Sequence, residues 1–260
     1  VIGVAVAALS AFVFIGGAAR VASITEKIVP IMAAFYILGA LVIIVMNYGM
    51  IPEAFRQIVV GAWNPGAAIG GFAGVAVSQA VKYGIARGLF SNEAGMGSAP
   101  NAAATANVTH PVKQGLIQTL AVFTDTLLIC TCTAFIILFS GAPLDGSSNG
   151  VQLTQQALTN EIGASGSIFV AVALFFFAFS SILGNYYYGE ANIRFITAKK
   201  WVLHTYRILV SGMVLFGSVA TLDLVWSLAD ITMALMAVCN LIAIIFLGKY
   251  AIRLLSDYRA

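Results

Sequence analysis

Hydrophobic residues form long runs in this chain, and polar segments interrupt them at intervals. A bilayer hydrocarbon core of about 30 Å requires about 20 helical residues, so runs of this length predict membrane-spanning helices. They lack the short apolar–polar alternation that marks the strands of a membrane barrel. We expect seven crossings: Val1–Gly17, Pro30–Tyr48, a third that ends near Val108, Gln114–Phe139, Ser165–Tyr188, Val202–Ala220 and Leu222–Leu247.

The composition supports a membrane protein. The chain is 60% hydrophobic and 9% charged, whereas a soluble domain has about 25% charged residues. We therefore predict an all-α, polytopic membrane helix bundle in a lipid bilayer, built as a single transmembrane domain over residues 1–260.

The basic residues predict the orientation. If the crossings alternate, one side of the membrane receives most of the 13 Lys and Arg residues. The opposite side receives Arg56, and Lys82 and Arg87 are not assigned. An excess of Lys and Arg marks the cytoplasmic side, so we expect a multi-pass protein of the inner (plasma) membrane with a cytoplasmic C-terminus and no nucleic-acid partner. The residues on the predicted cytoplasmic side are Arg20, Lys27, Lys113, Arg194, Lys199, Lys200, Arg207, Lys249, Arg253 and Arg259.

One polar stretch, "GLFSNEAGMGSAPNAAATA" at residues 88–106, falls within the expected third crossing. Gly95 and Gly97 permit backbone angles that other residues resist, and Pro100 suits the first turn of a helix. Ser98 is a suitable N-cap. We expect one helix to end near Glu93–Ala94 and a second to begin near Ser98.

A broken helix is tolerated in a membrane where it is buried in protein or lines a cavity. The new helix exposes N–H groups at its start, and the preceding helix exposes carbonyls at its end. Secondary transporters use such discontinuous helices to hold substrates and coupling ions. The alternative interpretation is a kinked helix that binds no ligand.

The string "GIARGLFSNEAGMGSAPNAAATA" closely resembles the signature of the alanine/glycine:cation symporter family, the sodium:alanine symporters. The likeness continues in "HPVKQGLIQTLAVFTDT", "FAFSSILGNYYYGE" and "LVWSLADITMALMAVCNLIAI", and covers essentially the whole chain. It implies an inverted-repeat, leucine-transporter-like fold with ten core helices. The chain would supply core helices four to ten, with the sixth discontinuous at residues 88–106, and would lack the first three.

The resemblance also implies a function. It indicates a secondary active transporter that couples inward movement of a sodium ion, or alternatively a proton, to uptake of a small neutral amino acid such as alanine or glycine by alternating access. No oligomer is required. In the implied fold the broken sixth helix lines the substrate site. The substrate-binding residues would then be Ser91, Asn92, Gly95, Met96 and Gly97.

Ser180 and Ser181 form a hydroxyl pair in an uncharged run, and the resemblance implies that they are sodium ligands. The alternative is that each hydroxyl bonds to the carbonyl four residues earlier in its own helix. The run continues into "NYYYGE", whose tyrosines we expect to anchor the helix at the membrane interface.

Three acidic residues have open roles. Asp125 is either a cation or proton site or a packing group bonded to Thr124 or Thr126. Glu93 either coordinates charge or stabilises the break by pairing with Arg87 or with backbone N–H groups. Asp230 either closes an outer gate or bonds to its neighbours. Intramembrane carboxylates are costly and usually have a partner or a role.

Other functional classes are less well supported. Both histidines, His110 and His204, fall at predicted cytoplasmic ends, and neither a metal-binding cluster nor a nucleophile elbow is present in the sequence, so we do not expect an enzyme. A channel would need a repeated filter or a ring of charges. A channel, or another transporter of the same fold with a different small substrate, is the alternative function.

Outside the crossings, "VQLTQQALTN" predicts a short surface helix.

Overall fold

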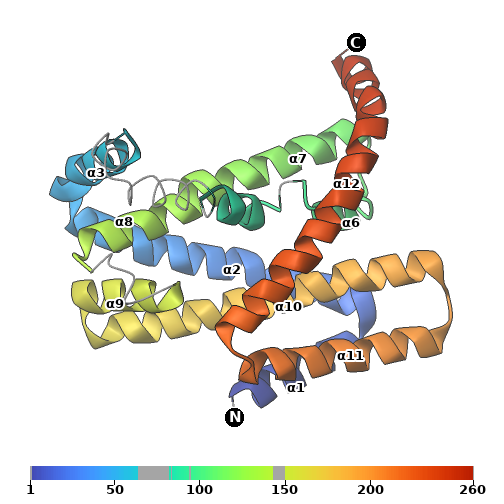
Figure 1. Ribbon diagram of the computed structural model, residues 1–260, viewed down its shortest axis with the longest axis horizontal. Coiled ribbons are helices and arrows are strands. Elements are labelled where there is room, and N and C mark those ends of the chain that lie inside the picture. Colours follow the sequence, from blue (N-terminus) through green and yellow to red (C-terminus); the bar gives the residue numbers. More distant parts are fainter. Residues whose placement is uncertain (1, 64–81, 83, 94, 143–149, 260) are drawn as a thin grey trace, which may run out of the picture. The chain divides into compact units, whose positions relative to one another are not determined.

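The computed structural model describes residues 2–63, 82, 84–93, 95–142 and 150–259, and all regular structure among them is helical (Figure 1). The all-α prediction is confirmed for this part of the chain. The elements are α1 (Ile2–Ile15), α2 (Gly17–Met46), the 3₁₀ turn η1 (Tyr48–Met50), α3 (Ile51–Trp63), a helical stretch at 84–91, α6 (Ala99–Ala103), α7 (Pro111–Thr124), the π-helical turn η2 (Asp125–Cys130), α8 (Thr131–Phe139), α9 (Val151–Ile162), α10 (Ala164–Ile196), α11 (Lys200–Val219) and α12 (Leu222–Arg259).

Five helices in the described part of the chain are long and apolar enough to cross a membrane, which makes this a polytopic membrane protein. The expected crossing at Val1–Gly17 forms the 14-residue helix α1, which is shorter than a bilayer requires. The expected third crossing is not among the five either, and part of it lies outside the described residues. The count of seven therefore stays a prediction. The five are Gly17–Met46, Pro111–Phe139, Ala164–Ile196, Lys200–Val219 and Leu222–Arg259.

Several helices extend beyond the apolar runs that predicted them. Helix α2 begins at Gly17 rather than at Pro30, which lies inside the helix. Helix α12 continues to Arg259 rather than ending near Leu247. Charged residues such as Lys and Arg are good helix formers, and the bilayer limits the length of the apolar run rather than the length of the helix. The hydropathy pattern therefore located the apolar part and missed these ends.

The chain divides into two compact units. The first comprises Val1–Ile31, Glu93–Thr119 and Phe176–Ala260. The second comprises Met32–Asn92 and Leu120–Phe175. Because α2, α7 and α10 each contribute residues to both units, the division does not follow the helix boundaries.

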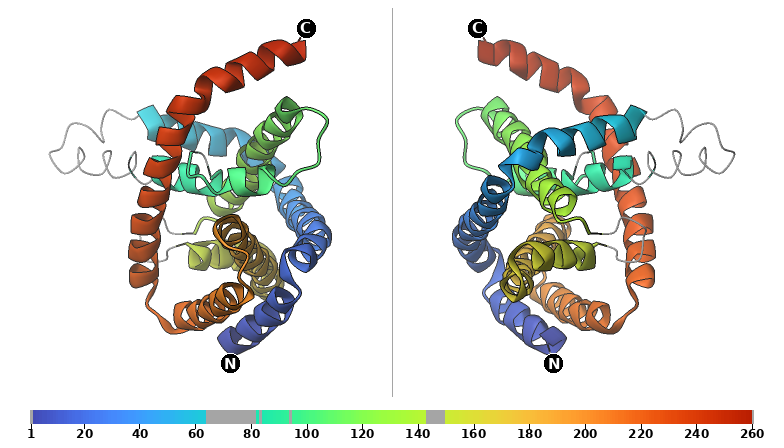
Figure 2. Two further views of the ribbon diagram at one scale, coloured as in Figure 1. Left: turned by 90° about the vertical axis from the view of Figure 1, so that its right-hand side faces the viewer. Right: turned by 90° about the vertical axis from the view of Figure 1, so that its left-hand side faces the viewer.

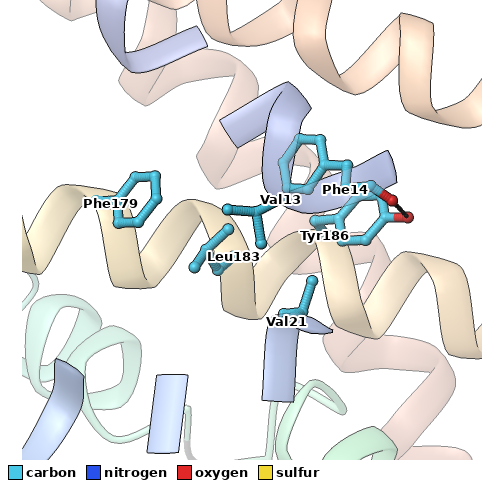
Figure 3. Packing of buried hydrophobic residues seen from close by; sticks show 6 residues of the cluster. All are labelled: Val13, Phe14, Val21, Phe179, Leu183 and Tyr186. Carbon is cyan, nitrogen blue, oxygen red and sulfur yellow. Dashed lines mark hydrogen bonds between the residues drawn. The ribbon is translucent and has the colours of Figure 1, made fainter. Parts of the chain in front are cut away.

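The first unit has a hydrophobic core where α1 packs along α11 (Figures 1 and 2) and both contact α10. Figure 3 shows the ring of Phe14 lying against that of Tyr186, with their centroids 3.9 Å apart and the planes 14° from parallel. Such stacking contributes beyond the area it buries. The buried members of the core are Val13, Phe14, Val21, Phe179, Leu183 and Tyr186.

The prediction that "NYYYGE" anchors the helix at the interface is wrong for Tyr186. This side chain is 1% exposed, because α1 and α11 cover its face of α10. Its hydroxyl lies against the Glu190 carboxylate and 3.5 Å from the carbonyl oxygen of Phe14. The Nε of Arg207 donates a 3.0 Å hydrogen bond to the same hydroxyl.

Glu190 is the most deeply buried charged residue among the described residues of the first unit, with none of its surface exposed. Its Oε1 lies 2.5 Å from Nη2 of Arg194 and 3.7 Å from Nη2 of Arg207. A buried carboxylate is tolerated when it is both paired and hydrogen-bonded. Glu190 meets both conditions, and its contacts join α10 to α11.

The second unit is held by α8 and its neighbours. Helix α9 packs against α8 and buries Ala157 and Leu158 completely, so the expected helix at "VQLTQQALTN" is confirmed. The hydroxyls of Tyr36 and Thr133 lie 2.6 Å apart and link α2 to α8. Near the end of α2, Nδ2 of Asn47 donates a 2.6 Å bond to the Glu161 carboxylate of α9.

We predict that Glu190→Gln lowers the free energy of unfolding by about 3 kcal/mol, because removing one partner of a buried ion pair leaves its arginines without a counter-charge. Thermal unfolding of the purified protein in detergent measures the change. The matched control is Glu53→Gln. Glu53 forms an exposed pair with Arg56 at 2.7 Å, and exposed pairs contribute little.

The contribution of the Glu53–Arg56 pair to stability also depends on pH in a defined direction. The hydrogen bond from Arg56 lowers the pKa of the Glu53 carboxyl, so the small contribution of this pair is present at neutral pH. It disappears as the pH falls through that lowered pKa. Equal losses of stability for Glu190→Gln and Glu53→Gln at neutral pH would contradict the importance given to the buried cluster.

Candidate functional site

The structure confirms a break in the polar stretch at residues 88–106. Residues 84–91 are helical, a turn follows at Asn92 and Glu93, and the next helix begins at Ala99. Gly95 has φ of 73° and Gly97 has φ of 93°, conformations that a side chain would strain. Glu93 also has a positive φ of 50°, which is uncommon for a residue other than glycine.

Two details of the predicted break are wrong. Helix α6 is only 5 residues long, so the helix that follows the break is too short to be the second half of a membrane-spanning helix. Ser98 occupies the N-cap position but makes no side-chain cap, and its backbone angles are already helical, with φ of −76° and ψ of −51°. Its hydroxyl instead donates to the Oε2 of Glu93 at 2.7 Å, so the side chain is directed to the carboxylate, and its oxygen does not accept from a backbone N–H of α6 as a cap would.

Glu93 stabilises the break through side-chain hydroxyls. Besides Ser98, which is 5% exposed, the hydroxyl of Tyr188 donates to Glu93 Oε2 at 3.4 Å. Hydrogen bonds to a charged acceptor are stronger than neutral ones. The sequence suggested Arg87 or backbone N–H groups as the stabilising partners and did not anticipate these two hydroxyls.

Helix α12 supplies a contact that sequence reasoning missed. The side-chain Nδ2 of Asn240 donates to the carbonyl oxygen of Gly95 at 3.0 Å. A Cβ built on Gly97 would lie 2.9 Å from the Cβ of Asn240, so the two backbones approach closely. The available signal was that Asn240 is the only amide side chain in the whole of Leu222–Arg259.

Further amides connect the break to α10. Nδ2 of Asn101 donates to the carbonyl of Gly97 at 3.0 Å, and Nδ2 of Asn192 donates to Oδ1 of Asn101 at 2.9 Å. Carbonyls that leave a helix inside a membrane need such partners because water is absent. The irregular segment is thus held by polar side chains from α6, α10 and α12.

The residues just before the break belong to the second unit and contact η2. The hydroxyl of Ser91 donates to Oδ2 of Asp125 at 2.5 Å. The hydroxyl of Thr126 donates to Oδ1 of Asn92 at 3.0 Å. Two of the five predicted substrate-binding residues, Ser91 and Asn92, are therefore hydrogen-bonded to η2. Ser91 bonds directly to Asp125, the predicted cation- or proton-binding residue.

Asp125 also starts the six-residue π-helical turn η2, which sequence reasoning did not anticipate. Such turns are rare and are frequently found at functional sites. The expected bonds between Asp125 and the adjacent threonines are not the ones formed. Thr124 donates to the Leu120 carbonyl at 2.9 Å, while Thr126 contacts Asn92.

The predicted sodium ligands lie in the part of α10 that belongs to the first unit. Ser180 is 8% exposed, and its hydroxyl donates to the Phe177 carbonyl at 3.0 Å, three residues earlier rather than four. Ser181 is exposed and lines a cavity of about 770 Å³ between α1, α10 and α11. Adjacent residues point about 100° apart on a helix, so the two hydroxyls have different surroundings.

The sequence matches the sodium:alanine symporter family over residues 1–260. The chain belongs to this family. Members are symporters and not enzymes, in agreement with the expectation from the sequence.

Sodium:alanine symporter relatives match nearly all of this chain. The amino-acid carrier protein AlsT of Bacillus subtilis (strain 168) is 48% identical over 258 residues, which are 99% of this chain and 54% of the relative. The probable sodium/glutamine symporter GlnT of the same organism is 47% identical over 257 residues, 99% of this chain and 53% of the relative.

A more distant relative is the sodium/proton-dependent alanine carrier protein of Bacillus sp. (strain PS3), 35% identical over 275 residues, 99% of this chain and 61% of the relative. The chain spans about half the length of the curated relatives it matches.

We predict that Gly97→Ala destabilises the protein more than Gly95→Ala. Both substitutions place a side chain at positive φ, which costs about 1–2 kcal/mol. Only the alanine at position 97 would also collide with α12, at 2.9 Å from Asn240, whereas the nearest atom at position 95 is 3.9 Å away. Thermal unfolding of the two variants in detergent tests the order, and a reversed order would show that the contact with α12 is absent.

Proposed function

We propose that the protein is a secondary active transporter that couples inward movement of sodium, or of protons, to uptake of a small neutral amino acid such as alanine or glycine. The observation that carries this proposal is the helix break of a symporter-family chain, whose irregular backbone is held by buried and half-buried polar side chains. Irregular backbone at membrane depth is a common feature of transporter binding sites.

We assign substrate binding to Ser91, Asn92, Gly95, Met96 and Gly97. The backbone from Gly95 to Gly97 can present N–H and C=O groups to a zwitterion, and Ser91 and Asn92 supply polar side chains. The thioether of Met96 offers apolar contact to a small side chain. The absence of side chains at positions 95 and 97 suits a small substrate.

We assign cation binding to the hydroxyls of Ser180 and Ser181, with Asp125 as a further cation or proton site. Sodium is a hard cation and takes oxygen ligands, including hydroxyls and carbonyls. The 2.5 Å hydrogen bond from Ser91 to Asp125 favours a role for this carboxylate in coupling, because binding of a cation or proton there would alter a hydrogen bond made by a substrate-binding residue.

The leucine-transporter-like fold, the inner-membrane location and the cytoplasmic C-terminus are parts of the same proposal. The relatives include proteins named as an alanine carrier and a probable glutamine symporter, so both amino acids belong in the substrate panel. A channel, or a transporter of this fold with another small substrate, is the alternative.

Transport by the purified protein in proteoliposomes tests the proposal. We expect an inward sodium gradient to drive accumulation of labelled alanine above its external concentration, with glycine and glutamine compared in counterflow and a proton gradient tested separately. Uptake that needs no cation gradient, or that only equilibrates alanine, would contradict symport. Flux without saturation would instead favour a channel.

We predict that Ser180→Ala and Ser181→Ala each raise the sodium concentration for half-maximal transport about tenfold, since loss of one ligand contact costs about 1.4 kcal/mol. The matched control is Ser211→Ala. The Ser211 hydroxyl bonds to the Arg207 carbonyl of its own helix at 2.9 Å. Unchanged sodium dependence in both test variants would remove the hydroxyl pair from the cation site.

A further inference from the structure

We propose that Asn240 is a positioning residue that fixes the Gly95–Gly97 segment in its binding conformation and thereby sets the affinity for substrate. The inference rests on the proposed function for the identity of the substrate. The structural part, that α12 holds the broken segment through one amide, stands on geometry alone.

The contact is specific in geometry. Asn240 lies 145 positions from Gly95 in the sequence, yet its Nδ2 donates to the Gly95 carbonyl at 3.0 Å. Figure 1 shows α12 passing α6, the helix that follows the broken segment. The next residue, Leu241, lies 3.9 Å from a Cβ built on Gly95, so one turn of α12 meets both glycines.

The close approach of Asn240 leaves no room for a side chain at position 97. The Cβ and Cγ of Asn240 lie 2.9 and 3.3 Å from the position of a Cβ on Gly97. Any side chain at position 97 would therefore push α12 away and lengthen the hydrogen bond to Gly95. Glycine at 97 is required by this approach as well as by its φ of 93°.

A polar side chain at position 240 supplies a donor to a backbone carbonyl that has no helical partner. Gly95 lies outside regular helix, so its carbonyl lacks the usual helical partner and would be costly to leave unsatisfied in an apolar setting. Asn240 is half-buried in an otherwise apolar turn of α12 and provides the donor. Because the same side chain bonds to Gly95 and leaves no room for a Cβ at position 97, a shift of α12 would change the shape of the segment that we assign to substrate binding.

The first test measures the segment directly and needs no knowledge of the substrate. Cys130, Cys132 and Cys239 are replaced by alanine, and a Met96→Cys variant on this background is labelled with N-ethylmaleimide in proteoliposomes. Adding Asn240→Leu should raise the labelling rate roughly tenfold, because the lost hydrogen bond frees the segment. Asn240→Asp keeps the shape of the side chain but, when ionised, has no N–H donor, and should act in the same direction.

The matched control is Thr232→Val on the same helix. The Thr232 hydroxyl bonds to carbonyls of its own helix at 2.9 and 3.0 Å, so this change removes a polar group from α12 without touching the break. Its labelling rate should equal that of the Met96→Cys parent. Asn240→Gln, which retains an amide, should restore part of the protection.

The second test separates positioning from general damage. In the otherwise unmodified protein, Asn240→Leu should raise the alanine concentration for half-maximal counterflow about tenfold, with the maximal rate within about twofold of the parent. Thr232→Val should change neither. A merely structural role would lower the maximal rate and the amount of folded protein instead.

The outcomes distinguish the two proposals. If the parent transports no amino acid but Asn240→Leu still accelerates labelling, the proposed function fails and the positioning role remains. If alanine transport is sodium-coupled but neither Asn240→Leu nor Asn240→Asp changes labelling or half-saturation, the positioning role is overturned. Should Asn240→Leu not fold, the Asn240→Asp variant decides the question by the same two measurements.

Discussion

The need to hydrogen-bond backbone groups that leave regular helix governs the candidate site in this protein. The chain leaves regular helix after residue 91 and resumes it at Ala99, and the intervening carbonyls need donors from elsewhere. Asn240 serves Gly95, and Asn101 serves Gly97. The site is therefore assembled by side-chain amides on α6 and α12 rather than by helix ends.

A second polar group organises the first unit at a different place. Glu190 lies among Tyr186, Arg194 and Arg207, and Tyr186 stacks on Phe14 of α1. An uncompensated carboxylate could not be buried there, so the cluster forms only when α1, α10 and α11 are packed together. This packing also shapes the cavity that Ser181 lines.

Part of the candidate site could be read from local sequence. Gly95, Gly97 and Pro100 located the break because glycine and proline act through the backbone of their own segment. Asn240, Tyr188 and Thr126 could not be assigned in this way, since their partners lie 145, 95 and 34 positions away. The π-helical turn at Asp125 could not be predicted either, because no residue type or spacing in the sequence distinguishes it from an ordinary α-helix.

The sequence by itself determined that the protein is helical and membrane-embedded, which family it belongs to, and where the stretch at residues 88–106 breaks. These properties follow from hydropathy, from local backbone preferences and from a long signature string. Only the tertiary structure decided which polar groups meet, how far α2 and α12 extend, and that Tyr186 is buried rather than interfacial. Those outcomes depend on which helix faces cover one another, and pairing between distant segments is not encoded in any single stretch of residues.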